Sequence, residues 1–302
     1  MDALSNFSLT GENTLSQILF ALVLVILVYV SLSGAEYVYT SITRMYKDRI
    51  ELFPDTIVSG PRMYTVVQNP LIAGSNTINF SDNQRSGVEF SYALFINVSS
   101  ATFNENTTGA QNLYHILHKG YSQLYPLFCP GIFLWGNTNT LRIFLNNFDT
   151  WNNHIDIQNI PMDKWFHLVI SCKGNTQYIY INGNLKAKTP MTNNSPPYQN
   201  FGNVYAFSGR KINISLKDSS SAPITGSLAT DPLFQGPNAL SSYNFAGPIT
   251  GMISRVYYFA YALTYTEIQS LMNMGPSSKM IGPDMTMTQS LSDTWWTNKL
   301  GP

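Results

Sequence analysis

Residues 165–183 read Trp-Phe-His-Leu-Val-Ile-Ser-Cys-Lys-Gly-Asn-Thr-Gln-Tyr-Ile-Tyr-Ile-Asn-Gly. Successive side chains of a β-strand point to opposite faces, so this run predicts two strands, at 165–172 and 177–181. A Gly-Asn turn joins them, and an Asn-Gly turn follows the second strand. One face of the first strand carries four residues that we expect in the core, namely Phe166, Leu168, Ile170 and Cys172.

Short strands separated by turn residues continue on both sides of this hairpin. We expect strands at 88–98, 113–117, 131–135, 141–145, 204–207, 212–216 and 251–260. Their regular spacing is typical of a β-sandwich or barrel. Thr264 and Glu267 have the spacing of a capping box and predict a short helix, which Gly275-Pro276 ends. Residues 190–245 are rich in Pro, Gly, Ser and Asn and predict surface loops.

Taken together, these elements resemble the concanavalin A-like, laminin-G-like jelly-roll superfamily. The resemblance rests on His-x-Val at 167–169, Tyr-x-Asn-Gly at 180–183 and the strand at 253–258 that leads into Ala262–Ile268. The strand at 90–98, with Lys119-Gly120 and Pro130-Gly131, matches the family's early strands. The resemblance implies a mainly β fold of two antiparallel sheets over residues 62–275, with loops at one rim.

The N-terminal region has a different character, because no charged residue lies between Glu12 and Glu36. A helix of this length matches the roughly 30 Å hydrocarbon core of a bilayer. We therefore predict a short tail at 1–14, a single transmembrane helix at 15–35 and a stalk at 36–61. The anchoring side chains would be Ile18, Leu19, Phe20, Leu22, Leu24, Ile26, Leu27 and Val30. A cleaved signal peptide and a buried core helix are the alternatives, although a signal peptide needs a basic segment before its apolar core.

Flanking charge predicts the orientation of this helix. Arg44, Lys47 and Arg49 follow it and no Lys or Arg precedes it, which places the large domain on the cytosolic side. Cys129 and Cys172 are the only cysteines, and two buried thiols are favoured over a disulfide in so large a domain. Six glycosylation sequons argue for the opposite sidedness, at Asn6, Asn79, Asn97, Asn106, Asn193 and Asn213.

Composition excludes one class of partner. Only 11% of the 302 residues are charged, and 17 basic residues balance 17 acidic ones. Nucleic-acid binding depends on clustered excess Lys and Arg, so we expect no nucleic-acid partner. A neutral chain rich in Asn, Ser, Thr and Tyr suits a surface packed among other proteins, and equally an ordinary β-domain.

The acidic residues do not form a catalytic pattern. Glycoside hydrolysis needs two carboxylates a few ångströms apart, and the Glu-x-Asp-x-x-Glu pattern of this superfamily's hydrolases is missing. We therefore expect no enzyme activity. Asp149, Asp156 and Asp163 are too widely spaced for a calcium loop, so no cofactor is expected, although some relatives bind Ca²⁺ at the sandwich rim. His115 and His118 would point apart on a strand, which argues against a metal site.

Aromatic residues supply the remaining candidates. Trp135 and Trp151 could stack on a sugar or a partner, but aromatics on strands belong more often to the core. Trp295 and Trp296 lie in a polar C-terminal tail at 276–302 and are a candidate contact with the domain, a partner protein or the membrane.

These observations lead to one leading hypothesis and two alternatives. The anchor, the Asn-rich jelly-roll domain and the Trp-Trp tail resemble membrane-anchored proteins of large icosahedral DNA viruses. The leading hypothesis is a non-enzymatic structural protein, either a minor capsid protein or a membrane-to-capsid link, whose partners are the lipid bilayer and other capsid or membrane proteins. Inside a virion it would lie between the internal membrane and the capsid. The first alternative is a membrane-displayed, lectin-like module that binds carbohydrate, and the second is a degenerate glucanase.

Overall fold

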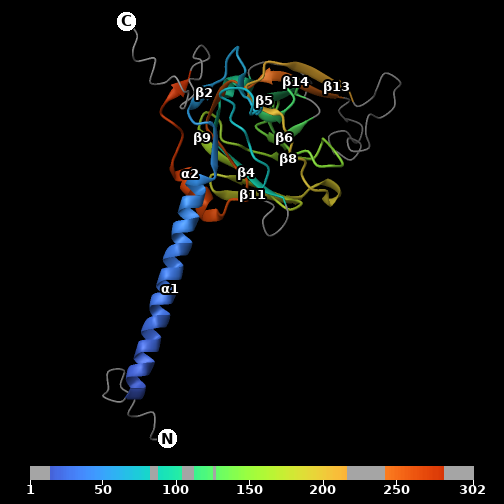
Figure 1. Ribbon diagram of the computed structural model, residues 1–302. Coiled ribbons are helices and arrows are strands. Elements are labelled where there is room, and N and C mark those ends of the chain that lie inside the picture. Colours follow the sequence, from blue (N-terminus) through green and yellow to red (C-terminus); the bar gives the residue numbers. More distant parts are fainter. Residues whose placement is uncertain (1–13, 82–87, 104–111, 125–126, 216–241, 282–302) are drawn as a thin grey trace. The chain divides into compact units, whose positions relative to one another are not determined.

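The computed structural model describes residues 14–81, 88–103, 112–124, 127–215 and 242–281 (Figure 1). The chain divides into two compact units, Met1–Arg49 and Ile50–Pro302.

The first unit is built on one long helix, α1 (Thr14–Lys47). It is long and apolar enough to cross a membrane over Gln17–Tyr46, which confirms the predicted apolar helix as a candidate membrane span. All side chains between Gln17 and Thr40 are exposed. The Ser31 hydroxyl donates to the Val28 carbonyl at 2.8 Å. Such a bond inside the helix satisfies a polar group that hydrocarbon would leave without a partner.

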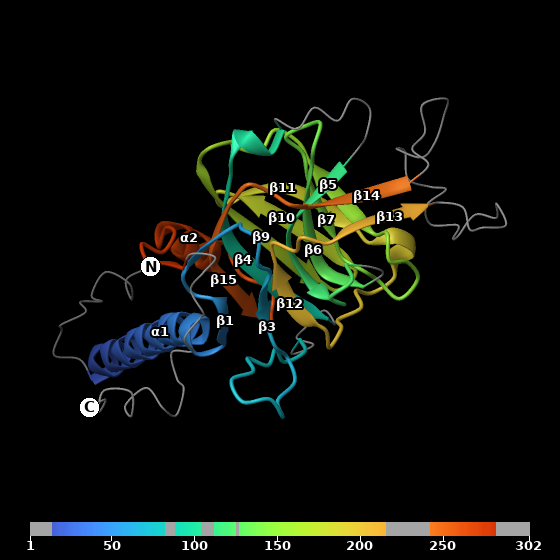
Figure 2. The same ribbon diagram turned by 90° about the horizontal axis from the view of Figure 1, so that it is seen from above.

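The second unit contains two β-sheets that face each other in a sandwich (Figure 2). In the part of the chain that is described, each sheet has eight strands. Sheet A has the order β11-β10-β9-β4-β15-β2-β16, and β1 also pairs with β15. Its strands are β1 (Arg49–Phe53), β2 (Thr56–Val58), β4 (Glu89–Val98), β9 (Trp165–Lys173), β10 (Thr176–Ile181), β11 (Asn184–Pro190), β15 (Gly251–Phe259) and β16 (Met280–Ile281).

Sheet B has the order β13-β14-β5-β6-β7-β8, and β12 bridges β5 to β3. Its strands are β3 (Tyr64–Val66), β5 (Asn112–Gly120), β6 (Phe128–Trp135), β7 (Leu141–Phe144), β8 (His154–Ile157), β12 (Asn203–Ala206), β13 (Lys211–Ser215) and β14 (Ser242–Pro248). Short 3₁₀ turns lie at Ser100–Phe103 and Thr192–Asn194.

The sandwich core forms between the two sheets, as the alternation of β9 predicts. Phe166, Leu168, Ile170 and Cys172 are all buried in one apolar cluster that also takes in Ile132 from sheet B. In sheet A, Leu168 is paired with Leu94 on β4 and Ile181 on β10. The predicted mainly β sandwich, and the expected core face of β9, are therefore confirmed.

The predicted short helix is α2 (Tyr265–Asn273), and its capping box is present. The Glu267 carboxylate accepts from the Thr264 backbone N–H at 2.7 Å and from the Tyr261 hydroxyl at 2.9 Å. The Ser91 hydroxyl on β4 accepts a hydrogen bond from the Leu263 N–H and donates one to the Tyr261 carbonyl. These bonds hold the segment before α2 against the face of sheet A that is turned away from the core.

Two expectations about the fold need correction. Residues 36–61 do not form a separate stalk, because α1 continues to Lys47 and β1 and β2 join sheet A. The physical reason is that Leu52, Phe53 and Ile57 are apolar and lie buried in the core. The sheets are also not wholly antiparallel, because β14 pairs with β5, and β16 with β2, in parallel.

Candidate binding surface

Five exposed aromatic side chains gather where several strands of sheet B end, and we call this set the aromatic rim: Phe80, Tyr121, Phe148, Tyr198 and Phe201. The rings of Phe80 and Phe201 are 4.5 Å apart between centroids, and those of Phe148 and Tyr198 are 5.2 Å apart. Tyr121 follows Gly120, the partner of Asn203 in the pairing of β5 with β12. The rim therefore draws its residues from four loops, at Phe80, at Tyr121, at Phe148 and at 198–201.

Phe201 is 80% exposed and Phe148 67%. Single exposed apolar residues are ordinary, but a cluster of rings is typical of an interaction surface.

A buried lysine holds the loop that carries Phe201. The Lys119 Nζ donates to the carbonyl oxygens of Asn200 and Gly202, and the Asn200 side chain donates back to the Lys119 carbonyl. Burial lowers the Lys119 pKa to about 8, so its ammonium is charged at neutral pH. A Cβ on Gly202 would overlap the Gly120 backbone, so only glycine allows this close approach.

Further backbone bonds fix the rest of the rim. The Tyr198 N–H donates to the Asn146 carbonyl at 2.8 Å. The Gln199 side chain accepts from the Ser81 N–H at 3.0 Å and donates to the Tyr258 hydroxyl at 3.2 Å. The loop at 196–202 has no regular structure, yet its backbone is held by specific bonds while its rings face outward. Such preorganisation lowers the entropy cost of binding a partner.

Beneath the rim, His115 and His118 lie side by side, which corrects the expectation that they point apart. His115 Nε2 is 2.8 Å from His118 Nδ1. The pairing of β5 with β6 shifts between His115 and Leu117, so Ile116 is an extra residue there. A β-bulge of this kind changes the alternation of side chains and brings positions i and i+3 to the same face. Both Ile116 and Leu117 then enter the core.

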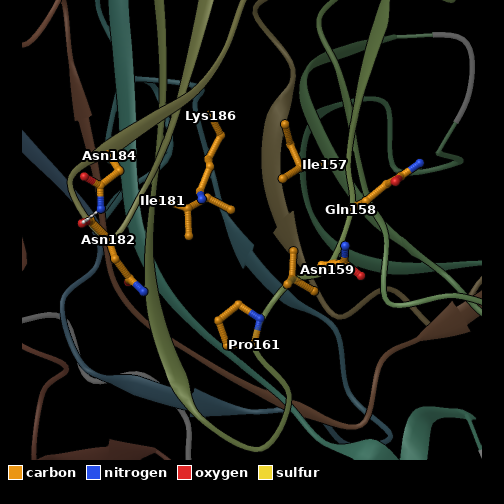
Figure 3. Close-up of a pocket in the computed structure, with 9 residues that line it drawn as sticks. Ile157, Gln158, Asn159, Pro161, Ile181, Asn182, Asn184 and Lys186 are labelled. Atoms are coloured by element: carbon orange, nitrogen blue, oxygen red, sulfur yellow. Dashed lines mark hydrogen bonds between the residues drawn. The ribbon is translucent and has the colours of Figure 1, made fainter.

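A cleft lies at the sandwich edge, between the chain after β8 and the turn from β10 to β11 (Figure 3). This cleft has a volume of about 360 Å³. Its lining residues are Ile157, Gln158, Asn159, Ile160, Pro161, Ile181, Asn182, Asn184 and Lys186. Figure 3 shows Asn184 hydrogen-bonded to the Asn182 carbonyl, at 3.2 Å. Amide groups over an apolar floor suit a small polar ligand, and no carboxylate is among these lining residues.

The three aspartates considered as calcium ligands lie apart from one another, each with its own contacts. Asp156 forms a bidentate pair with the buried guanidinium of Arg142, at 2.7 and 2.6 Å. Asp163 accepts the Ser100 N–H at 3.0 Å, and this hydrogen bond lowers its pKa. Asp149 is exposed, beside Asn147. Over the described ranges, no three His, Cys, Asp or Glu side chains are grouped closely enough to hold a metal ion.

Two buried glutamates of the sandwich unit have structural contacts. Glu89 is buried and lies 3.8 Å from the Lys173 ammonium, and Glu267 caps α2. The structure brings neither together with a second carboxylate in a hydrogen-bonded pair, within the residues it describes.

The remaining predicted residues are placed as follows. Trp135 is buried on the outer side of sheet B under the Arg142 guanidinium, 4.8 Å away, and is no platform for a sugar. Trp151 is half-buried and stacks on Phe144. Cys129 and Cys172 are buried free thiols, as predicted, and burial raises the pKa of Cys129 to about 12. Trp295 and Trp296 lie outside the described residues.

The eight apolar residues predicted to anchor the chain all lie exposed on α1: Ile18, Leu19, Phe20, Leu22, Leu24, Ile26, Leu27 and Val30. The bilayer contact of these residues stays a prediction.

Residues 73–213 match the family model of the concanavalin A-like lectin/glucanases superfamily. The matched segment includes strands β4 to β12 of the sandwich. No curated protein sequence matches the chain. Among solved structures, a botulinum neurotoxin type G receptor-binding domain is 16% identical, with a TM-score of 0.41 over 72% of this chain and 45% of that one. A crystal structure of the serotype G binding domain is 15% identical, with a TM-score of 0.44 over 74% and 45% of the two chains.

The serotype C1 binding domain is 15% identical, with a TM-score of 0.36 over 62% and 36%. The chain therefore spans less than half the length of these neurotoxin chains. Likeness at this level says nothing of what this protein binds.

The aromatic rim was missed in the sequence because its members are far apart in the chain. Phe80 and Phe201 are separated by more than a hundred residues, and only the pairing of β12 with β3 and β5 brings their loops together. One usable signal was present. Tyr198 and Phe201 lie within a segment rich in Pro, Asn and Gly, where a large aromatic residue has no strand to cover it.

Proposed function

We propose that this protein is a non-enzymatic structural protein held on a membrane by α1, and that its concanavalin A-like domain binds other proteins through the aromatic rim. In its most specific form, it is a minor capsid protein or a membrane-to-capsid link of a large DNA virus. The single observation that carries the binding role is a surface of exposed rings on a backbone that a buried lysine holds in place.

The anchoring part of the proposal rests on exposed apolar surface. Residues such as Ile18 and Leu27 are more than 60% exposed on α1, and water solvates such surface poorly. A bilayer would cover this apolar surface, and no protein partner would be needed to do so. The positive-inside rule, applied to Arg44 and to Arg49 just after the helix, favours a cytosolic domain, whose sequons would then carry no glycan.

The rim supports a protein partner more than a nucleic acid. Its members are uncharged, and the chain as a whole has 17 basic and 17 acidic residues. Aromatic residues are enriched among those that dominate protein–protein binding energy, especially where they are held rigidly. The viral part of the proposal rests in addition on the sequence resemblance to membrane-anchored proteins of large DNA viruses. A cytosol-facing domain on an internal membrane would face the capsid as the virion assembles.

Site-specific photo-cross-linking in native membranes tests the proposal. A photoreactive amino acid at Phe201 should form an adduct with one or a few defined proteins. The matched control places it at Leu185, which is half exposed on β11 of sheet A. Adducts from position 201 that are no more frequent or specific than those from position 185 would refute the binding role of the rim.

The second candidate function is carbohydrate binding at the amide-lined cleft, and the cleft itself favours it. Asn159, Asn182 and Asn184 bring amide donors and acceptors around an apolar floor that includes Ile181. A glycan array with the purified protein distinguishes the two functions. A reproducible hit that Asn159→Ala abolishes, together with no protein adduct at the rim, would replace the structural role by a lectin.

A further inference from the structure

The bonds around His115 and His118 define the protonation of both rings. The Ser208 backbone N–H donates to His115 Nδ1 at 2.8 Å, so that nitrogen carries no proton. His115 Nε2–H then donates to His118 Nδ1, and His118 Nε2–H donates to the Tyr121 carbonyl, each at 2.8 Å. Every ring nitrogen is used once, and the chain of bonds closes only when both imidazoles are neutral.

A proton added to either histidine ring breaks this series of hydrogen bonds. A proton on His115 Nδ1 would face the Ser208 N–H, and a proton on His118 Nδ1 would face the His115 Nε2–H, so two donors would oppose each other. Both rings are buried, which leaves no room for water to relieve the conflict. Burial lowers the pKa of His118 to about 4 and that of His115 well below its usual range, and the His118 ring further lowers the His115 value.

No counter-charge on the neighbouring described elements offsets such a proton. On β12, Tyr205 stacks on His118 with 5.0 Å between ring centroids. On β5, the Lys119 ammonium is turned to Asn200 and Gly202, and it is itself positive. From β6, Phe128 and Phe133 contact the pair with their ring edges, while the titratable Cys129 faces the core. Arg210, after β12, is exposed and also positive.

The same chain of bonds reaches the aromatic rim. His118 holds the carbonyl of Tyr121, which is a member of the rim. His115 holds Ser208, and β12 runs between Ser208 and the loop that carries Phe201. If protonation breaks the hydrogen bonds of the two histidines, the segment after β12 loses its bond to His115. The turn at Tyr121 then loses its bond to His118. The strands of sheet A make none of these contacts.

We propose that His115 and His118 form a pH-sensitive latch, which holds the aromatic rim in its binding form at neutral pH and releases β12 and the Tyr121 turn on acidification. The role of the latch in binding rests on the proposed function of the rim. The opening itself does not, and it is measured without any partner.

Hydrogen exchange of the full-length protein in detergent micelles tests the latch. Each histidine freed in the open state binds a proton with a pKa near 6.5, so two of them should raise the opening equilibrium about 60-fold between pH 6 and pH 5. This change is expected in peptides covering 119–124 and 203–209, after correction for the intrinsic exchange rate. Peptides covering 184–190 on β11, the edge strand of sheet A, free no histidine when they open locally and should not follow it.

Two variants sharpen the test. His115→Asn keeps an acceptor for Ser208 but removes one titrating ring, so the change between pH 6 and pH 5 should fall to about 8-fold. His167→Gln removes a buried histidine from sheet A and should leave the response of 203–209 as in the wild type. If His115→Asn fails to fold, the size of the wild-type response at 203–209 still tests the latch. A response at 203–209 no larger than that at 184–190 would overturn the latch, whatever the cross-linking experiment shows.

Discussion

Replacing Leu168 by alanine tests the assigned core directly. Leu168 is fully buried on β9, and its neighbours across the two adjacent strands are Leu94 and Ile181. Strands β4 and β10, on the two sides of β9, hold these neighbours in place, so little collapse into the new cavity is expected. Leu→Ala at such a site removes transfer free energy and leaves a cavity, and typically costs 2–5 kcal/mol. We expect about 3 kcal/mol here, by the same rule.

Thermal unfolding of the full chain in detergent micelles, followed by circular dichroism in the far ultraviolet at 218 nm, measures this loss. For a domain of this size the midpoint should fall by about 6–12 °C, because 1 kcal/mol corresponds to roughly 2–4 °C. Leu185→Ala makes the same chemical change at a half-exposed position on β11 and should shift the midpoint much less. Equal shifts for the two variants, or a loss below about 0.5 kcal/mol for Leu168→Ala, would mean that the face of β9 is assigned wrongly.

Three further predictions concern the anchor, the thiols and acid stability. Deleting residues 15–35 should move the protein from the membrane to the soluble fraction with its β-sheet circular dichroism retained; retention on membranes after a high-salt wash would contradict anchoring by α1. Cys129 and Cys172 are buried thiols with raised pKa values, so a maleimide should label them only at the rate of unfolding; fast labelling in the native state, read by mass spectrometry, would contradict their burial. The folded-state pKa of His118 and of His167 is lowered to about 4, so the unfolded chain binds more protons below pH 6.5. The free energy of unfolding should therefore fall as pH drops from about 6.5 to about 4, by roughly 3 kcal/mol per histidine, and urea titrations that show no loss over this window would refute the neutral state.

Local patterns in the sequence predicted much of the fold. Alternation identified both strands of the hairpin at 165–181 and its core face, because each side chain there alternates without interruption. The capping box at Thr264 and Glu267 was equally readable, since its bonds are made within one turn of helix. The resemblance to a known superfamily then predicted two sheets in a sandwich.

Features that depend on long-range pairing escaped prediction. The segment at 49–58 is short and interrupted by Pro54, and only its pairing with β15 makes it part of sheet A. The bulge at Ile116 is set by the register of β5 against β6, so the alternation rule placed His118 on the wrong face. The aromatic rim needs loops from distant parts of the chain, and no local spacing encodes it.

Membrane flotation tests the central claim, that one end of the protein is held in a bilayer while the rim of its domain binds another protein. The protein that cross-links through position 201 should float with wild-type membranes and should remain in the soluble fraction when residues 15–35 are deleted. The double variant Phe148→Ser, Phe201→Ser should itself still float but should carry at least tenfold less of the partner, since exposed aromatic anchors of this kind dominate binding energy. Undiminished partner on membranes that carry the double variant would contradict the account.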